Sequence, residues 1–120
     1  MFAPEAGAGM DRGEHKVRPY DMTIYKAPYE QFAVSLDFAA DIGTGNSIAS
    51  ITAVTATSDL TRLDSTEEVI ASSPAPAISG RGVVFTVRGG VAGDRHTIAV
   101  QIVSSIGEQY QGDVTLEIVG

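Results

Sequence analysis

The chain has 120 residues, the size of one ordinary domain with room for a short appendage. Eight basic and fifteen acidic residues give a net charge of −7, which opposes binding to nucleic acid or to an anionic membrane surface. The lack of cysteine excludes disulfides, thiolate nucleophiles and cysteine-ligated zinc. No apolar run approaches the roughly 20 residues that span a membrane, and no secretory signal opens the chain. We therefore expect a protein assembled inside a cell.

Residues 1–30 differ in composition from the rest of the chain. They contain Pro4, Pro19 and Pro28, three glycines and mixed charges, and no period of 2 or 3.6 organises their apolar residues. An extended segment of about 30 residues reaches on the order of 90 Å at roughly 3.3 Å per residue. We therefore predict an N-terminal arm over residues 1–30 that binds a neighbouring subunit. Its predicted anchors are the apolar and aromatic side chains Phe2, Met10, Val17, Tyr20, Ile24, Tyr25 and Tyr29.

The last ten residues of this segment allow a second interpretation. Residues 24–29 could fold back and add an edge strand to the chain's own domain instead of reaching a partner. Composition does not decide between the two, so both stay open.

The segment after the arm alternates strictly between apolar side chains and small or polar ones, which is typical of a half-buried strand. Its apolar positions are Phe32, Val34, Leu36 and Phe38. After turn residues at 41–46, the β-branched side chains of residues 47–57 predict a second strand. Ile51 departs from the parity of Ile48 and Val54, so we expect a β-bulge there.

The middle of the chain is its least regular part. Residues 58–66 are polar and rich in turn formers, and residues 67–71 predict a short strand. Ser65 followed by Glu67 and Glu68 also resembles the start of a helix, which Pro74 would stop within two turns. Pro74 and Pro76 exclude a central strand over residues 73–76, because proline has no N–H to donate.

Two alternating runs, residues 83–87 and 96–104, flank a glycine-rich segment and predict a β-hairpin. The structural turn residues are Gly89, Gly90 and Gly93 here, and Gly107 in the next turn. A last strand places Val114, Leu116 and Ile118 on one face. Together these segments predict an all-β fold: an immunoglobulin-like antiparallel β-sandwich of six to seven strands over residues 31–120, with an extended N-terminal arm.

The chain shows no recognisable catalytic or ligand-binding constellation. His96 shares the parity of the apolar residues that follow it, so we expect it to point inward in a structural role. The acidic residues between 59 and 68 lack a calcium-binding spacing, and no serine has a base at a known motif spacing. The glycines at 89–93 lack the lysine of a phosphate-binding loop and lead into a strand. We therefore expect no catalytic residue, no cofactor and no metal, and a protein that is not an enzyme.

The order of motifs along the domain resembles a known family. Residues 36–42, residues 45–48, the glycines at 89–93, and residues 98–105 with Gly107 resemble the small immunoglobulin-like proteins of tailed bacteriophages. The resemblance covers residues 34–118. His96 and Glu108 depart from the family pattern, in which an aromatic residue and an arginine are common.

The resemblance implies a virion structural protein, a neck or tail adaptor assembled in the host cytoplasm. Its implied partners are other virion proteins: neck, tail or portal-region subunits and a fibre, contacted by multiple copies in a ring. Nucleic acid and membrane are not expected partners. Two alternatives stay open, a decoration protein on the capsid surface and a sandwich module of a bacterial surface protein that binds carbohydrate or calcium.

Overall fold

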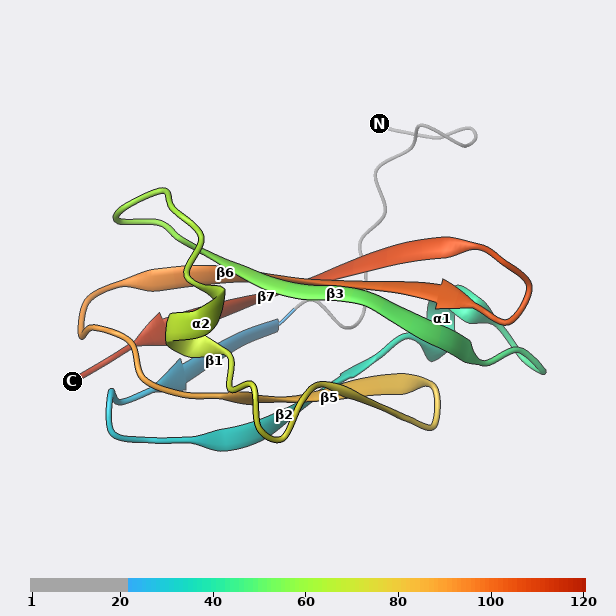
Figure 1. Cartoon of the computed structure of the whole chain (residues 1–120), viewed down its shortest axis with the longest axis horizontal. Helices are drawn as coiled ribbons and strands as arrows, with labels where there is room; N and C mark the ends of the chain where they lie inside the picture. The colour runs from blue at the N-terminus through green and yellow to red at the C-terminus, as the bar shows by residue number, and fades with distance from the viewer. Residues whose placement is uncertain (1–21) are drawn as a thin grey trace.

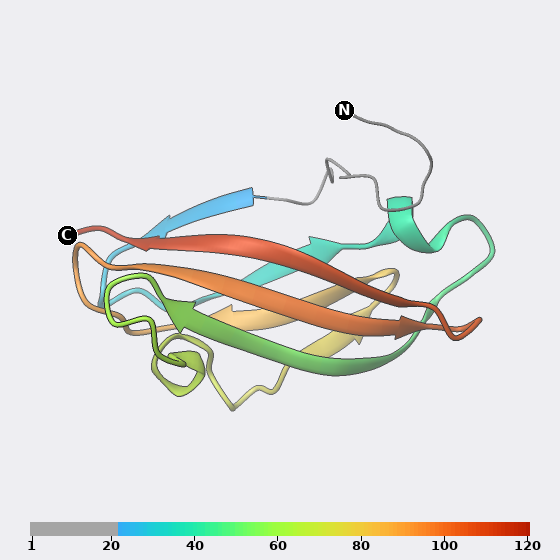
Figure 2. The ribbon, with the colours of Figure 1, turned by 90° about the horizontal axis from the view of Figure 1, so that it is seen from above.

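The computed structural model describes residues 22–120, which form seven strands in two facing sheets and two one-turn helices (Figures 1 and 2). The four-stranded sheet has the order β1 (Met22–Lys26), β7 (Gln109–Ile118), β6 (Arg95–Ser104), β3 (Ile48–Ser58). The three-stranded sheet has the order β2 (Phe32–Asp37), β5 (Gly82–Val87), β4 (Ala77–Ser79). The helices are α1 (Ala39–Ile42) and α2 (Thr66–Val69). The prediction of a mostly β fold with six to seven strands is confirmed for the described residues, although β1 lies before residue 31, where the sandwich was predicted to begin.

The core lies between the sheets and follows the period-2 pattern of the sequence. In β6 and β7 every second side chain is buried, including Ile98, Val100, Val114 and Leu116, each with no exposed surface. β5 is the central strand of its sheet and is an almost continuous apolar run, with Phe85 1% exposed. Such interdigitation of two inner faces is what stabilises a sandwich.

The predicted hairpin between residues 83–87 and 96–104 is wrong. β5 pairs with β2 and β4, whereas β6 pairs with β3 and β7, so residues 88–94 carry the chain from one sheet to the other. Alternation of apolar residues marks a half-buried strand but does not identify its partner, and both arrangements have the same pattern. The hairpin in this part of the chain is instead β6–β7, whose turn contains Gly107 at a φ of 87°.

Two of the three glycines of the crossing segment, Gly89 and Gly90, are required by space as well as by backbone angle. Gly89, Gly90 and Gly93 have φ values of 58°, 94° and 93°. A β-carbon at Gly89 would lie 2.7 Å from the carbonyl oxygen of Glu68, and one at Gly90 would lie 2.6 Å from Cδ1 of Ile118. The crossing therefore passes too close to α2 and to the end of β7 for any side chain.

Three further sequence expectations have clear outcomes. The β-bulge near Ile51 is confirmed by register shifts in the β3–β6 pairing, between Ile48 and Ser50 and between Ile51 and Ala53. Residues 66–69 form a helical turn, so the helical alternative holds and the short strand over residues 67–71 does not. α1 and the three-residue β4 were not predicted, because both are short and lack a period.

The N-terminal strand β1 belongs to the chain's own domain, which was the second interpretation of this segment. It also shows that the predicted antiparallel sandwich contains one parallel pair. β1 pairs in parallel with β7, from Met22 opposite Val114 to Lys26 opposite Ile118. The four-stranded sheet is therefore mixed: β1 runs parallel to β7, whereas the β7–β6 and β6–β3 pairs are antiparallel. Within the stretch called the arm, residues 22–26 belong to the sandwich as an edge strand.

The crossing glycines provide a matched pair of substitutions. Gly90→Ala should destabilise the domain by about 1–3 kcal/mol more than Gly93→Ala. Both glycines have nearly the same φ. An added β-carbon at Gly90 would meet the buried side chain of Ile118, whereas one at Gly93 would have no atom within 4 Å. Urea denaturation followed by circular dichroism measures the difference. Equal destabilisation would show that backbone angle alone selects glycine at these positions.

Candidate interaction surface

One end of the sandwich gathers four chain segments, and we call it the loop end. It consists of the β1–β2 turn (residues 27–31), the β3–α2 connection (59–65), the β5–β6 crossing (88–94) and the C-terminal residues 119–120 (Figure 1). These segments touch. An added β-carbon on Gly120 would lie 2.9 Å from Cβ of Ala92 and 3.9 Å from Cδ of Pro28, and Asp59 N donates a hydrogen bond to the Arg95 carbonyl at 2.7 Å.

Large apolar side chains stand exposed at the loop end. Tyr29 is 97% exposed, Leu60 74% and Leu63 68%, and Val91 and Val119 are also exposed. Single exposed apolar residues are ordinary, but five that share one end of a small domain indicate a surface that binds another protein.

A buried carboxylate holds the β3–α2 connection against the start of β6. Asp94 is 7% exposed, and its Oδ2 accepts a hydrogen bond from Ser58 Oγ at 2.8 Å. Its Oδ1 accepts from the backbone N–H groups of Arg95 at 2.8 Å and Leu60 at 3.3 Å. Burial acts to raise the pKa of Asp94, but these hydrogen bonds and nearby His96 outweigh it, and the pKa lies below its ordinary value.

Ser65 comes together with His96 and Asp94, although it precedes His96 by 31 residues. Ser65 Oγ lies 2.7 Å from His96 Nδ1, and His96 Nε2 lies 3.4 Å from Asp94 Oδ2. The three residue types are those of a hydrolytic triad, yet His96 has no exposed surface and Ser65 is 5% exposed. A hydroxyl closed off from solvent has no room for a substrate, so the arrangement anchors the loop.

His96 lies where the sequence predicted it, facing inward near a strand end. The sequence analysis did not identify Ser65 and Asp94 as its partners. Ser65 follows a turn-rich stretch and Asp94 follows a glycine, and neither position has a motif spacing that predicts the contact.

Lys26 fixes the other side of the loop end. Its side chain is fully buried, and its Nζ donates hydrogen bonds to the carbonyl oxygens of Ala27 and of Gly89 in the crossing segment. Burial lowers the pKa of Lys26, although the charge of Glu30 acts in the opposite direction. This role could not be predicted from the sequence, since a lysine at the end of a strand ordinarily faces solvent.

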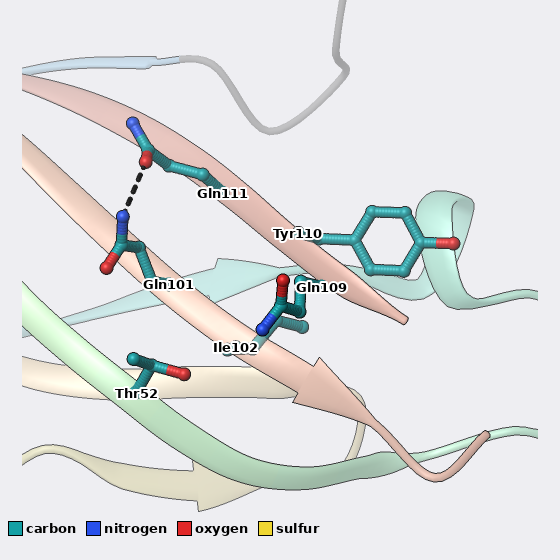
Figure 3. Close-up of a pocket in the computed structure, with 6 residues that line it drawn as sticks. All are labelled: Thr52, Gln101, Ile102, Gln109, Tyr110 and Gln111. Atoms are coloured by element: carbon teal, nitrogen blue, oxygen red, sulfur yellow. Dashed lines mark hydrogen bonds between the residues drawn. The ribbon is translucent and has the colours of Figure 1, made fainter. Parts of the chain in front are cut away.

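A hollow lined mostly by polar side chains lies on the four-stranded sheet, away from the loop end (Figure 3). It has a volume of about 270 Å³ and is lined by Thr52, Gln101, Ile102, Gln109, Tyr110 and Gln111. Gln101 Nε2 donates to Gln111 Oε1 at 2.9 Å, so these two amides partly satisfy each other. The six lining residues carry no formal charge at neutral pH. The hydrogen bond to Glu108, with burial, raises the pKa of Tyr110 to about 12. The hollow is a weaker candidate than the loop end.

The predicted arm anchors fall into three groups. Ile24 is half-buried and packs against the sandwich core, while Tyr25 at 62% exposure and Tyr29 are free for contacts with another molecule. Phe2, Met10, Val17 and Tyr20 lie outside the described residues.

Over residues 22–120, no three histidine or acidic side chains gather as a metal would require. No helix in that range is long and apolar enough to cross a membrane.

The sequence pattern of one protein family, described as the podophage GP4 fiber-tail adaptor protein gp77, matches residues 26–117. The matched range begins at the last residue of β1 and ends one residue before the end of β7, so it spans nearly the whole sandwich. This chain belongs to that family. It is therefore a virion structural adaptor and a component of the phage tail, as the resemblance implied.

Other comparisons add little to the adaptor's description. No curated protein matches the chain. One similar solved structure is a 2,6-sialyltransferase of Vibrionaceae Photobacterium sp. JT-ISH-224, with 18% identity and a TM-score of 0.42. The match covers 87% of the adaptor but 19% of the sialyltransferase chain, so the adaptor spans about a fifth of that protein. A likeness at this level carries no argument about activity.

The lowered pKa of Asp94 makes a prediction about stability and pH. Because the folded pKa lies below the ordinary value near 3.9, the carboxylate stabilises the fold at higher pH, and this contribution is lost as the pH falls through the folded pKa. Asp94→Asn should therefore reduce the free energy of unfolding by about 1–3 kcal/mol at pH 7, and by clearly less near pH 3. Urea denaturation of both proteins at the two pH values measures this, and a difference independent of pH would contradict it.

Proposed function

We propose that this adaptor is a non-enzymatic connector present in several copies around the phage tail, with its N-terminal segment gripping a neighbouring subunit and its loops contacting the fibre. The observation that carries the proposal is the family match over residues 26–117, which favours a fiber-tail adaptor over a capsid decoration protein or a bacterial surface module. The exposed apolar loop end supplies a surface suited to protein contacts. Repetition around a ring would add avidity to contacts that are individually modest.

We also propose that the sandwich is immunoglobulin-like. In that fold one sheet contains the third, sixth and seventh strands, and the other contains the second, fourth and fifth. The neighbours β3–β6–β7 and β2–β5–β4 agree with this arrangement, and so does the crossing between β5 and β6. In place of a first strand in the smaller sheet, β1 lies parallel to β7 at the edge of the larger one.

A role without catalysis is supported by the environment of the one arrangement that resembles a catalytic site. Ser65, His96 and Asp94 are all buried. Ser65 and His96 share a hydrogen bond, and Asp94 accepts hydrogen bonds from Ser58 Oγ and from the backbone N–H groups of Leu60 and Arg95. Each of these contacts serves to hold the loop end in shape. A structural adaptor needs such rigidity and requires no reactive group.

The division of the chain into an arm and a sandwich is also a proposal, and β1 refines it. Residues 22–26 are held by five register pairs with β7, so the part free to bind a partner is residues 1–21. Tyr25 and Tyr29 lie next to it as exposed aromatic anchors within the original boundary of residue 30. Aromatic residues commonly dominate the energy of protein interfaces.

Deletion of residues 1–21 tests the proposed arm. The deletion leaves β1 and the core intact, so the isolated domain should keep its cooperative unfolding transition. Incorporation into phage particles should fall at least tenfold, because the contact with the neighbouring subunit is lost. Quantitative immunoblotting of purified particles measures incorporation. A folded deletion variant that enters particles at the wild-type level would refute the arm's role.

A further inference from the structure

We propose that the loop end of one copy of this chain receives residues 2–20 of a neighbouring copy. The inference rests on the proposed arm and extends it, because it names the surface that the arm binds. Three observations on the described domain support it: the rigidity of the apolar side chains at the loop end, the shape and charge of the hollow beside them, and the direction in which β1 enters the sheet.

The exposed leucines are held outward by a fixed backbone. Leu60 N donates to both Ser58 Oγ at 3.1 Å and Asp94 Oδ1, and the Leu63 carbonyl accepts from Ser58 N at 3.0 Å. Asp64 on the same loop forms a β-bridge with Thr57. The connection therefore loses little conformational entropy when it binds, and apolar side chains presented in this way are preorganised for a partner.

A hollow of about 550 Å³ opens beside Leu60 at the loop end. Apolar lining comes from Leu60, Ile118 and Val119, and the charged side chains of Asp59 and of the Arg95–Glu117 ion pair stand around them. Arg95 Nη2 and Glu117 Oε2 are 3.0 Å apart. A lining that combines apolar and charged residues suits an extended peptide that carries isolated apolar side chains between charged ones.

The chain's own N-terminal sequence has that character. Phe2, Met10 and Val17 are spaced by small and charged residues, and residues 12–18 contain three basic residues against one acidic one. Residues 22–120 hold eleven acidic and five basic residues, a net charge of −6. The loop end and the adjoining α2 carry more acidic than basic side chains: Glu30, Asp59, Asp64, Glu67, Glu68 and Asp94 against Arg62 and Arg88. The basic stretch of the arm is therefore attracted to this end of the domain.

The direction of β1 favours a neighbouring copy over the chain's own domain. β1 starts at Met22, opposite Val114 in the middle of β7, and runs toward the loop end (Figure 2). A segment that continues the line of β1 backward from Met22 leads away from its own loop end. Twenty-one residues span up to roughly 70 Å when extended at about 3.3 Å per residue, which exceeds the 43 Å length of the molecule. The segment is thus long enough to reach the loop end of an adjacent subunit.

Disulfide trapping tests the contact directly, because the chain contains no cysteine of its own. One full-length protein carries Gly9→Cys beside Met10, and a second carries Leu63→Cys at the loop end. The matched control carries Ile106→Cys in the β6–β7 turn at the opposite end, where the side chain is 60% exposed against 68% for Leu63. On mild oxidation, the first pair should form mixed disulfide dimers at least tenfold faster than the Gly9→Cys and Ile106→Cys pair.

Two further measurements complete the test. Leu60→Ser added to the Leu63→Cys protein should slow trapping at least threefold, and so should raising the salt concentration from 50 to 500 mM, since salt screens the attraction of the basic stretch. Equal trapping at Leu63 and Ile106 would overturn the inference. So would a chain with both Gly9→Cys and Leu63→Cys that forms only an internal disulfide, because that result places the arm on its own domain.

Particle assays separate this inference from the proposed function on which it rests. A Leu60→Ser/Leu63→Ser variant should enter phage particles at least tenfold less than an Ile106→Ser control. If the variant enters normally while deletion of residues 1–21 still blocks incorporation, the arm keeps its role and the loop end is not its receiver. If the deletion has no effect, the proposed function of the arm itself fails.

Discussion

The crossing of the chain from β5 to β6 is the constraint on which this architecture depends. It joins a central strand of one sheet to a central strand of the other, so the two sheets must face each other at the distance that the crossing spans. Gly89 passes against the backbone of α2 and Gly90 against Ile118, and neither approach leaves room for a β-carbon. The same segment ends at Asp94, which places a hydrogen-bond acceptor beneath the β3–α2 connection.

Buried polar groups then shape the end of the sandwich that the crossing creates. A buried charge is costly unless hydrogen bonds satisfy it, so Asp94 and Lys26 fix the backbone groups that they contact. Asp94 holds residues 58–60 and Lys26 holds Gly89, so the ends of β3 and β1, two strands of the four-stranded sheet, are tied to the crossing segment. With their polar groups engaged inward, these loops turn Leu60 and Leu63 toward solvent.

Local patterns in the sequence predicted the strands and the inward face of each one. Alternation located β2, β6 and β7, and the irregular parity of Ile51 located the bulge. Strand partnership could not be predicted in this way: the glycines at 89–93 indicated a hairpin, and they serve a crossing whose need for glycine comes from atoms of Glu68 and Ile118. The buried contacts of His96 with Ser65 and of Lys26 with Gly89 span 31 and 63 residues, and long-range pairs of this kind leave no periodic signal.

In the proposed function, the sandwich of this adaptor provides rigidity and its N-terminal segment provides reach. The sandwich supplies a rigid end, because every loop that presents an exposed leucine or tyrosine there is tied to the core by hydrogen bonds or strand pairing. In the proposed function the residues before β1 supply length, and β1 would pass a pull on them into β7, since a parallel edge strand loaded along its axis shears several hydrogen bonds at once. A strand peeled sideways would break those bonds one at a time. Anchoring the proposed arm through β1 therefore suits the proposed contact with a neighbouring subunit.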